Sequence, residues 1–146
     1  MDAAERKARI DQLAPWFVTM SRALHLAHWE LRTPYEETPS DEQMTASIER
    51  TYGRNAARIY LSDHFLGVDL EEQRETYTHE LLHCHFRAII EARDGLEDLL
   101  GKPANLIFVD RMKMAEEWAV DAIAGALAPH LPLPPVFKPK RKPKKG

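Results

Sequence analysis

The sequence predicts an α+β domain in which a small, mostly antiparallel sheet packs on two of the helices. Three observations lead to this prediction. Apolar residues recur every three or four positions at the start of the chain and again in its second half, as in amphipathic helices. Short alternating segments lie between them, as in strands. With 146 residues, of which 44% are hydrophobic, the chain can bury one core.

The first predicted elements are a helix over residues 3–24 and a strand over residues 28–32. Spacings of three and four place one apolar stripe on the helix: Ile10, Leu13, Phe17, Met20 and Leu24. Pro15 interrupts this pattern, so that the helix either kinks there or gives way to a second helix. In the strand, Trp29 and Leu31 share one face.

A β-hairpin follows in the middle of the chain. Residues 46–52 and 57–61 both alternate between polar and apolar side chains, and Gly53-Arg54-Asn55 supplies a turn between them. Ala57, Ile59 and Leu61 fall on one face of the second strand. This pattern predicts two antiparallel strands with that face toward the core.

The second half of the chain reads as helical. A helix is predicted over residues 70–93, glycines and a proline interrupt the pattern near 95–103, and a last helix is predicted over 104–127. The proline-rich and lysine-rich residues 131–146 cannot pack a core, so they are predicted to be a tail that is disordered or polyproline-like. The folded domain is therefore predicted to span residues 1–130.

Charge is distributed unevenly along the chain. Residues 138–146 hold six of the 20 lysines and arginines and no acid, which leaves residues 1–137 with a net charge of −9. Such a domain is poorly suited to hold phosphates by its own field. The tail itself can bind nucleic acid or an acidic partner weakly and without specificity, or can act only as a solubilising segment.

Composition also bounds the compartment and the class of site. The single cysteine, Cys84, excludes a disulfide framework and any zinc site built on paired cysteines. No apolar run reaches the length of a membrane span, and no secretory signal opens the chain, so a cytoplasmic protein without membrane partners is expected.

The motif that indicates chemistry is His79-Glu80-Leu81-Leu82-His83, the H-E-x-x-H pattern. Residues four apart lie on one face of a helix, so both imidazoles can bind one metal ion. Glu80 is offset by about 100° around the helix, beside the metal, where it can take a proton from water. Zinc suits a site of nitrogen and oxygen ligands with one position left for water.

The third ligand is predicted on the last helix. Glu117 and Asp121 lie four apart on one face, so that Glu117 can complete the ligand set and Asp121 can accept the free ring N–H of a ligating histidine. The alternatives for the third ligand are Glu116, His85, His64 and Asp110. Cys84 is interpreted as a small apolar filler, and His25, His28 and His130 have no partner pattern.

The order of these elements resembles the minimal zincin metallopeptidase core. Residues 57–62 followed by 78–83 are similar to SprT-like domains, including phage-encoded metallopeptidase domains, and residues 117–124 resemble the glutamate helix of gluzincins and of ImmA/IrrE-type peptidases. The resemblance covers roughly residues 10–128. It implies a bacterial cell or a phage-infected host cell as the setting.

The resemblance implies a peptidase with one zinc ion per chain, held by His79, His83 and Glu117, that hydrolyses protein or peptide substrates. Glu80 would be the general base. In zincins the edge strand beside the site helix aligns the substrate, and here that strand is expected to be the one with Ala57, Ile59 and Leu61. The alternative function is an inactive zinc-binding adaptor that associates with nucleic acid or an acidic partner through its tail.

Overall fold

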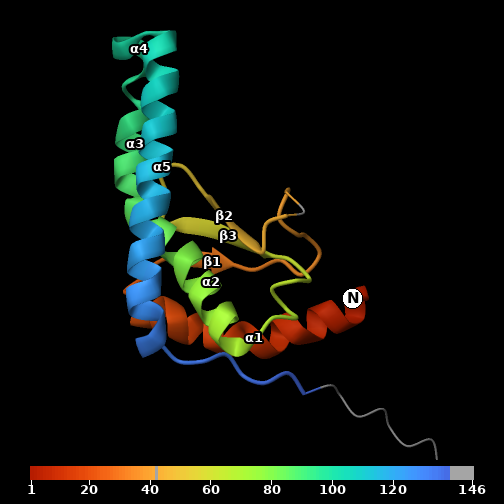
Figure 1. The fold of residues 1–146 in the computed structure, drawn as a ribbon. Coiled ribbons are helices and arrows are strands. Elements are labelled where there is room, and N and C mark those ends of the chain that lie inside the picture. Colours follow the sequence, from red (N-terminus) through yellow and green to blue (C-terminus); the bar gives the residue numbers. More distant parts are fainter. Residues whose placement is uncertain (42, 139–146) are drawn as a thin grey trace, which may run out of the picture.

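The computed structural model describes residues 1–41 and 43–138. Figure 1 shows a long N-terminal helix below a small sheet, with a second long helix beside both. The chain is α+β, as predicted. Its elements in order are α1 (Ala3–Ala23), β1 (Glu30–Arg32), β2 (Ala46–Arg50), β3 (Ala56–Leu61), α2 (Leu70–Leu82), a 3₁₀ turn (His83–Phe86), α3 (Arg87–Asp94), α4 (Glu97–Leu100), α5 (Lys102–Leu127) and a second 3₁₀ turn (Ala128–His130).

The sheet has three strands in the order β1-β3-β2 and is mixed. β2 and β3 form the predicted antiparallel hairpin, with Ile48 opposite Ile59. β1 pairs with β3 in parallel, with Leu31 opposite Ala57, so the expectation of a mostly antiparallel sheet is wrong for this pair. Because β1 joins the far side of β3, the central strand is β3 and the edge strands are β1 and β2.

Helix α1 is one continuous helix that contains Pro15, so the alternative of a second helix is wrong. The side chain of Asp2 caps its start by accepting a hydrogen bond from the backbone N–H of Glu5. The predicted apolar stripe faces the main core, where Met20 and Ile59 are fully buried. The core therefore joins α1 to the inner face of the sheet.

The helix predicted over 70–93 is divided, because α2 ends at Leu82 and a 3₁₀ turn follows. In a continuous α-helix the carbonyl of His83 would accept from the N–H of Arg87. Here the side chain of Arg50 donates to that carbonyl (2.7 Å), and the N–H of Arg87 bonds to Cys84 instead. The motif therefore lies at the end of α2 rather than in the middle of a longer helix.

α3 and α4 run beside the first half of α5 and form an arm that extends past the sheet (Figure 1). Gly101 separates α4 from α5 with a positive φ of 71°, a conformation that favours glycine. The second half of α5 packs on α2 through Leu82, Val120 and Ala124. None of the helices in the described ranges is both long and apolar enough to cross a membrane.

Residues 131–138 form no helix or strand and contact the domain through hydrogen bonds. The indole N–H of Trp16 donates to the carbonyl of Pro132 (2.8 Å), and Arg74 donates to that of Leu131 (3.1 Å). The side-chain amide of Gln12 bonds to both backbone groups of Lys138. The carbonyl of Pro132 accepts from a buried indole, so the backbone at this residue is held against the domain. The rest of the predicted tail, residues 139–146, lies outside the described residues.

Candidate metal centre

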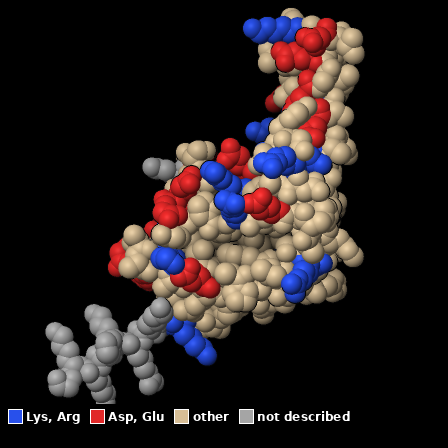
Figure 2. Space-filling view, turned by 180° about the vertical axis from the view of Figure 1, so that it is seen from behind, with Lys and Arg blue, Asp and Glu red and all other residues tan. Residues whose placement is uncertain are grey.

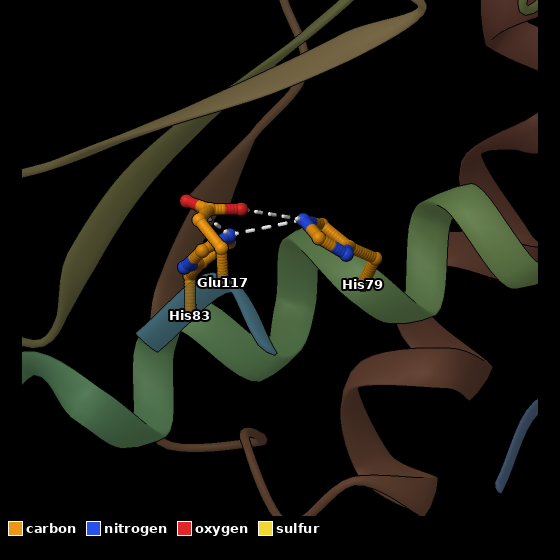
Figure 3. Close-up of side chains that lie close together, drawn as sticks. All are labelled: His79, His83 and Glu117. Atoms are coloured by element: carbon orange, nitrogen blue, oxygen red, sulfur yellow. Dashed lines mark hydrogen bonds and ion pairs between the residues drawn. The ribbon is translucent and has the colours of Figure 1, made fainter. Parts of the chain in front are cut away.

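Three side chains predicted to hold a metal come together between α2 and α5. His79 projects from α2 and His83 from the start of the 3₁₀ turn that follows it, and Glu117 projects toward them from α5 (Figure 3). The pairing of Glu116 with His83 and of Asp121 with His79 shows that α5 runs antiparallel to α2. The group His79, His83 and Glu117 is therefore built by two helices that are joined by their own small apolar cluster.

The distances between the donor atoms fit a single ion. The two Nε2 atoms are 3.1 Å apart, and the Glu117 oxygens lie 3.5 Å from Nε2 of His79 and 3.7 Å from Nε2 of His83. A tetrahedral zinc ion with bonds of about 2.0–2.1 Å requires ligand atoms about 3.4 Å apart. Two nitrogens and one carboxylate with this spacing form a donor set that zinc accepts.

Each imidazole is held by a carboxylate on its other nitrogen. Nδ1 of His79 lies 2.9 Å from Asp121, as predicted for that residue, and Nδ1 of His83 lies 2.8 Å from Glu116. Such partners fix the tautomer in which Nε2 is free to bind a metal. Glu116 in turn accepts from Arg50 (2.6 Å), so that the β2 strand, α2 and α5 meet at this carboxylate.

The two carboxylates differ in their surroundings. The side chain of Glu116 is 6% exposed and that of Asp121 is 67% exposed. Burial alone would raise the pKa of Glu116, but the hydrogen bonds with His83 and Arg50 outweigh burial and hold its pKa below the ordinary value. Glu116 is therefore a charged acceptor inside the protein.

Glu80 lines the same cleft and is not among the metal-binding donors. It is 7% exposed, and burial raises its pKa from 4.5 to about 7; the charge of His83 opposes this shift and that of Glu117 adds to it. None of the described residues forms a hydrogen bond with its carboxyl group. Glu80 therefore lies at the wall of the cleft without belonging to the donor group.

The donor group opens into a cleft of about 820 Å³ between α2, α5 and β2. The backbone N–H of Ser62 donates to the carbonyl of Thr45, and that of Thr51 donates to the carbonyl of Ala56. In the β2–β3 register these bonds show that every second residue of β2, counted from Thr45, is hydrogen-bonded to β3. Backbone N–H and C=O groups of Ala46, Ile48 and Arg50 therefore point away from β3, toward the open edge. This edge of the sheet lines the cleft.

The expectation that the strand with Ala57, Ile59 and Leu61 is an edge strand is wrong. They belong to the central strand β3, and their side chains are at most 3% exposed in the core. β3 lies in the middle of the sheet because β1 and β2 pair with its two edges. The edge beside the site is β2.

The other residues considered as ligands lie elsewhere. His85 bonds to the carbonyl of Leu24 (2.9 Å), and His64 is an exposed side chain near Glu72. Asp110 is exposed on α5 and is not part of the donor group. Cys84 is 2% exposed in the main core, and burial raises its pKa to about 12, which agrees with its predicted role as a filler.

Sequence reasoning missed Arg50 and the role of Glu116. A signal for Glu116 was present, because Glu116, Val120 and Ala124 recur every four residues and form the buried face of α5. Arg50 gave none, since its partners lie 33 and 66 residues away. No family model, curated protein or solved structure matches this chain.

Proposed function

We propose that this protein is a zinc-dependent peptidase of the zincin type. The observation that carries the proposal is the spacing of three donor atoms for one tetrahedral ion, with Glu80 beside them at the wall of an open cleft. A metal held only for stability needs neither the cleft nor the carboxyl group. In the H-E-x-x-H motif of metallopeptidases, the two histidines bind zinc and the glutamate is the general base, which supports the proposal.

The proposed ligands are His79, His83 and Glu117, with one zinc ion per chain. When bound, zinc supplies Lewis-acid chemistry, since it lowers the pKa of a water molecule and polarises a carbonyl group. Asp121 and Glu116 keep the imidazoles in the binding orientation. Arg50 keeps Glu116 in place and charged.

Glu80 is the proposed general base. Its carboxylate accepts the proton of the attacking water and donates it to the leaving amine as the peptide bond breaks. The free edge of β2 is proposed to hold the substrate as an added strand, through the backbone groups of Ala46, Ile48 and Arg50. This role replaces the one that the sequence assigned to β3.

A paired measurement of metal content and turnover tests the proposal. The purified protein is expected to carry about one zinc per chain by elemental analysis and to cleave a denatured protein substrate. Glu80→Gln is expected to keep the zinc and lose at least about 99% of turnover, because it removes the base and no ligand. Glu117→Ala is expected to lose zinc. Wild-type protein without zinc, or a Glu80→Gln variant with full turnover, would refute the peptidase.

The competing function, an inactive adaptor bound through the basic tail, predicts zinc without turnover. The folded domain gives this alternative little support. On the face shown in Figure 2, lysine and arginine side chains are interspersed with aspartate and glutamate, so neither sign forms a continuous surface on this face. Absence of turnover from zinc-loaded wild-type protein would favour the adaptor.

A further inference from the structure

We infer that the cleft selects peptides by charge, with an acidic residue two or three positions before the scissile bond and a basic residue two or three positions after it. The inference rests on the proposed peptidase function and concerns its substrate class. It is carried by the positions of the cleft's charged side chains and by the free edge of β2.

Most charges in the cleft are already paired or belong to the metal centre. Arg50 and Glu116 bond to each other, Asp121 bonds to His79, and Glu80 and Glu117 act at the metal. The remaining charged lining residues are Glu72, Glu75, Arg93 and Lys113. These four side chains therefore determine the electrostatic potential around a bound peptide.

These four side chains divide by sign between the two ends of the cleft. Glu72 and Glu75 lie on α2 before His79, toward the start of that helix. Lys113 lies on α5 before Glu117, and because α5 runs antiparallel to α2, this is the opposite end. Arg93 of α3, which follows the motif in the chain, lines the same end as Lys113.

Of the two cations at this end, Lys113 is the one whose charge is not already paired within the described part of the chain. It is exposed and has no ion-pair partner among the described residues, whereas Arg93 is bonded to Asp94. At the other end, Glu75 is exposed and likewise has no cationic partner in the described ranges. Glu72 lies 4.0 Å from His64. The uncompensated charges are thus Lys113 at one end and Glu75 at the other.

The edge of β2 gives the peptide a direction. Arg50, at the end of β2, bonds to the carbonyl of His83, so β2 and α2 both end at the cationic end of the cleft. A peptide added antiparallel to β2, the more stable pairing, then starts at the cationic end and finishes near Glu75 and Glu72. Acidic residues are therefore favoured before the scissile bond and basic residues after it.

Helix geometry gives the register. Four residues separate Lys113 from Glu117 and Glu75 from His79, which is about 6 Å along a helix axis, and Glu72 is about 10 Å from His79. An extended peptide advances about 3.4 Å per residue. The complementary charges therefore belong two or three residues from the bond that is cut.

Three peptides of equal length, with fluorophore and quencher at their ends, test the inference. The first has glutamates two and three positions before the central bond and lysines two and three positions after it. The second exchanges the glutamates and lysines, so that its composition and net charge are unchanged. The third has glutamine at all four positions. The first peptide is expected to exceed the second in kcat/KM by at least about tenfold, with the third between them, and the ratio is expected to shrink in about 0.5 M salt.

Charge reversals in the cleft test the assigned residues. Lys113→Glu and Glu75→Lys are each expected to lower the ratio between the first and second peptides about three- to fivefold, as for exposed ion pairs. Lys102→Glu on α5 and Glu71→Lys on α2 are the matched controls, since both lie outside the cleft lining. The controls are expected to change the ratio less than about 1.5-fold.

Binding to the zinc-loaded Glu80→Gln protein, followed by fluorescence anisotropy, separates this inference from the proposed function. If the wild type cleaves all three peptides equally, or prefers the second, the charge selection is refuted while the peptidase stands. If Glu80→Gln protein binds the peptides in the expected order but wild-type protein cleaves none, the peptidase is refuted and the charge selection stands. If the peptides are neither bound nor cleaved, both are refuted.

Discussion

Replacement of the two carboxylates that hold the imidazoles should affect zinc affinity unequally. Glu116→Gln and Asp121→Asn each remove one negative charge and keep a side chain of the same shape. In both variants an amide oxygen can still accept from Nδ1. The comparison therefore isolates the charge of each partner at similar distances, 2.8 Å for Glu116 and 2.9 Å for Asp121.

The burial of the two groups sets the expected magnitudes. Loss of an outer partner of a zinc-bound histidine typically weakens metal binding about 10- to 100-fold. Glu116 is 6% exposed and also compensates Arg50, so Glu116→Gln should lie near the upper limit, about 100-fold or 2.7 kcal/mol. Asp121 is 67% exposed and screened by water, so Asp121→Asn should lie near or below about tenfold.

Competition with a chromogenic chelator measures both affinities directly. Thermal unfolding at saturating zinc provides a second readout, because a ligand stabilises the folded state according to its affinity. At the same saturating zinc concentration, the stabilisation that zinc adds to the free energy of unfolding should therefore be about 2.7 kcal/mol smaller for Glu116→Gln than for the wild type. If Asp121→Asn weakens zinc as much as Glu116→Gln, or if Glu116→Gln binds within about twofold of the wild type, burial does not govern these partners and the reasoning fails.

Three further outcomes follow from the described contacts. His83→Ala should abolish zinc binding measured by elemental analysis, and the melting temperature of this variant should no longer respond to added zinc. A chain that ends at Lys138 lacks five cations of the tail and should melt like the full chain, but it should lose any salt-sensitive DNA binding. For those five cations the full chain should show a log–log salt slope of at most about −4.5. A chain that ends at His130 should lose about 1–3 kcal/mol in urea unfolding, because Trp16 loses its hydrogen-bond acceptor. Burial alone would raise the pKa of Asp63, but the amino group of Met1 and the side chain of Arg6 hold its pKa below 3.8. The charged carboxylate therefore stabilises the fold above that pH, and this contribution is lost as the pH falls. Asp63→Asn should show a smaller loss of stability between pH 5 and pH 2 than the wild type. Equal acid sensitivity of Asp63→Asn and the wild type would contradict the prediction for Asp63. Equal stability of the chains that end at Lys138 and at His130 would contradict the prediction for the tail.

Local patterns were sufficient to identify α1, α5, the hairpin and the pair His79 and His83. Helical spacing alone places His79 with His83 and Glu117 with Asp121, because residues four apart share a face whatever the rest of the chain does. The same holds for the β2–β3 hairpin, whose turn lies within a few residues of both strands. The helix boundaries near His83 were not predictable, since a side chain of β2 displaces the helical hydrogen bond there.

Local patterns could predict neither the order of the strands in the sheet nor the contacts of the tail with the domain. The alternation of Ala57, Ile59 and Leu61 indicates a strand with one buried face but carries no information about which strands flank it. The order β1-β3-β2 arises because β1 pairs in parallel with β3. Likewise, composition left residues 131–138 as disordered or polyproline-like, because it cannot show that Trp16 and Gln12 supply hydrogen-bond partners from the other end of the chain.

The sequence by itself determined that two imidazoles share one helix face and that Glu116 and Glu117 on a second helix are candidates to join them. Only the tertiary structure decided between the adjacent carboxylates Glu116 and Glu117, which point about 100° apart around α5. Packing of Val120 and Ala124 against Leu82 sets the rotation of α5, turns Glu116 inward to His83 and Arg50, and leaves Glu117 facing both Nε2 atoms. That rotation is a property of two packed surfaces far apart in the chain, and no local spacing encodes it.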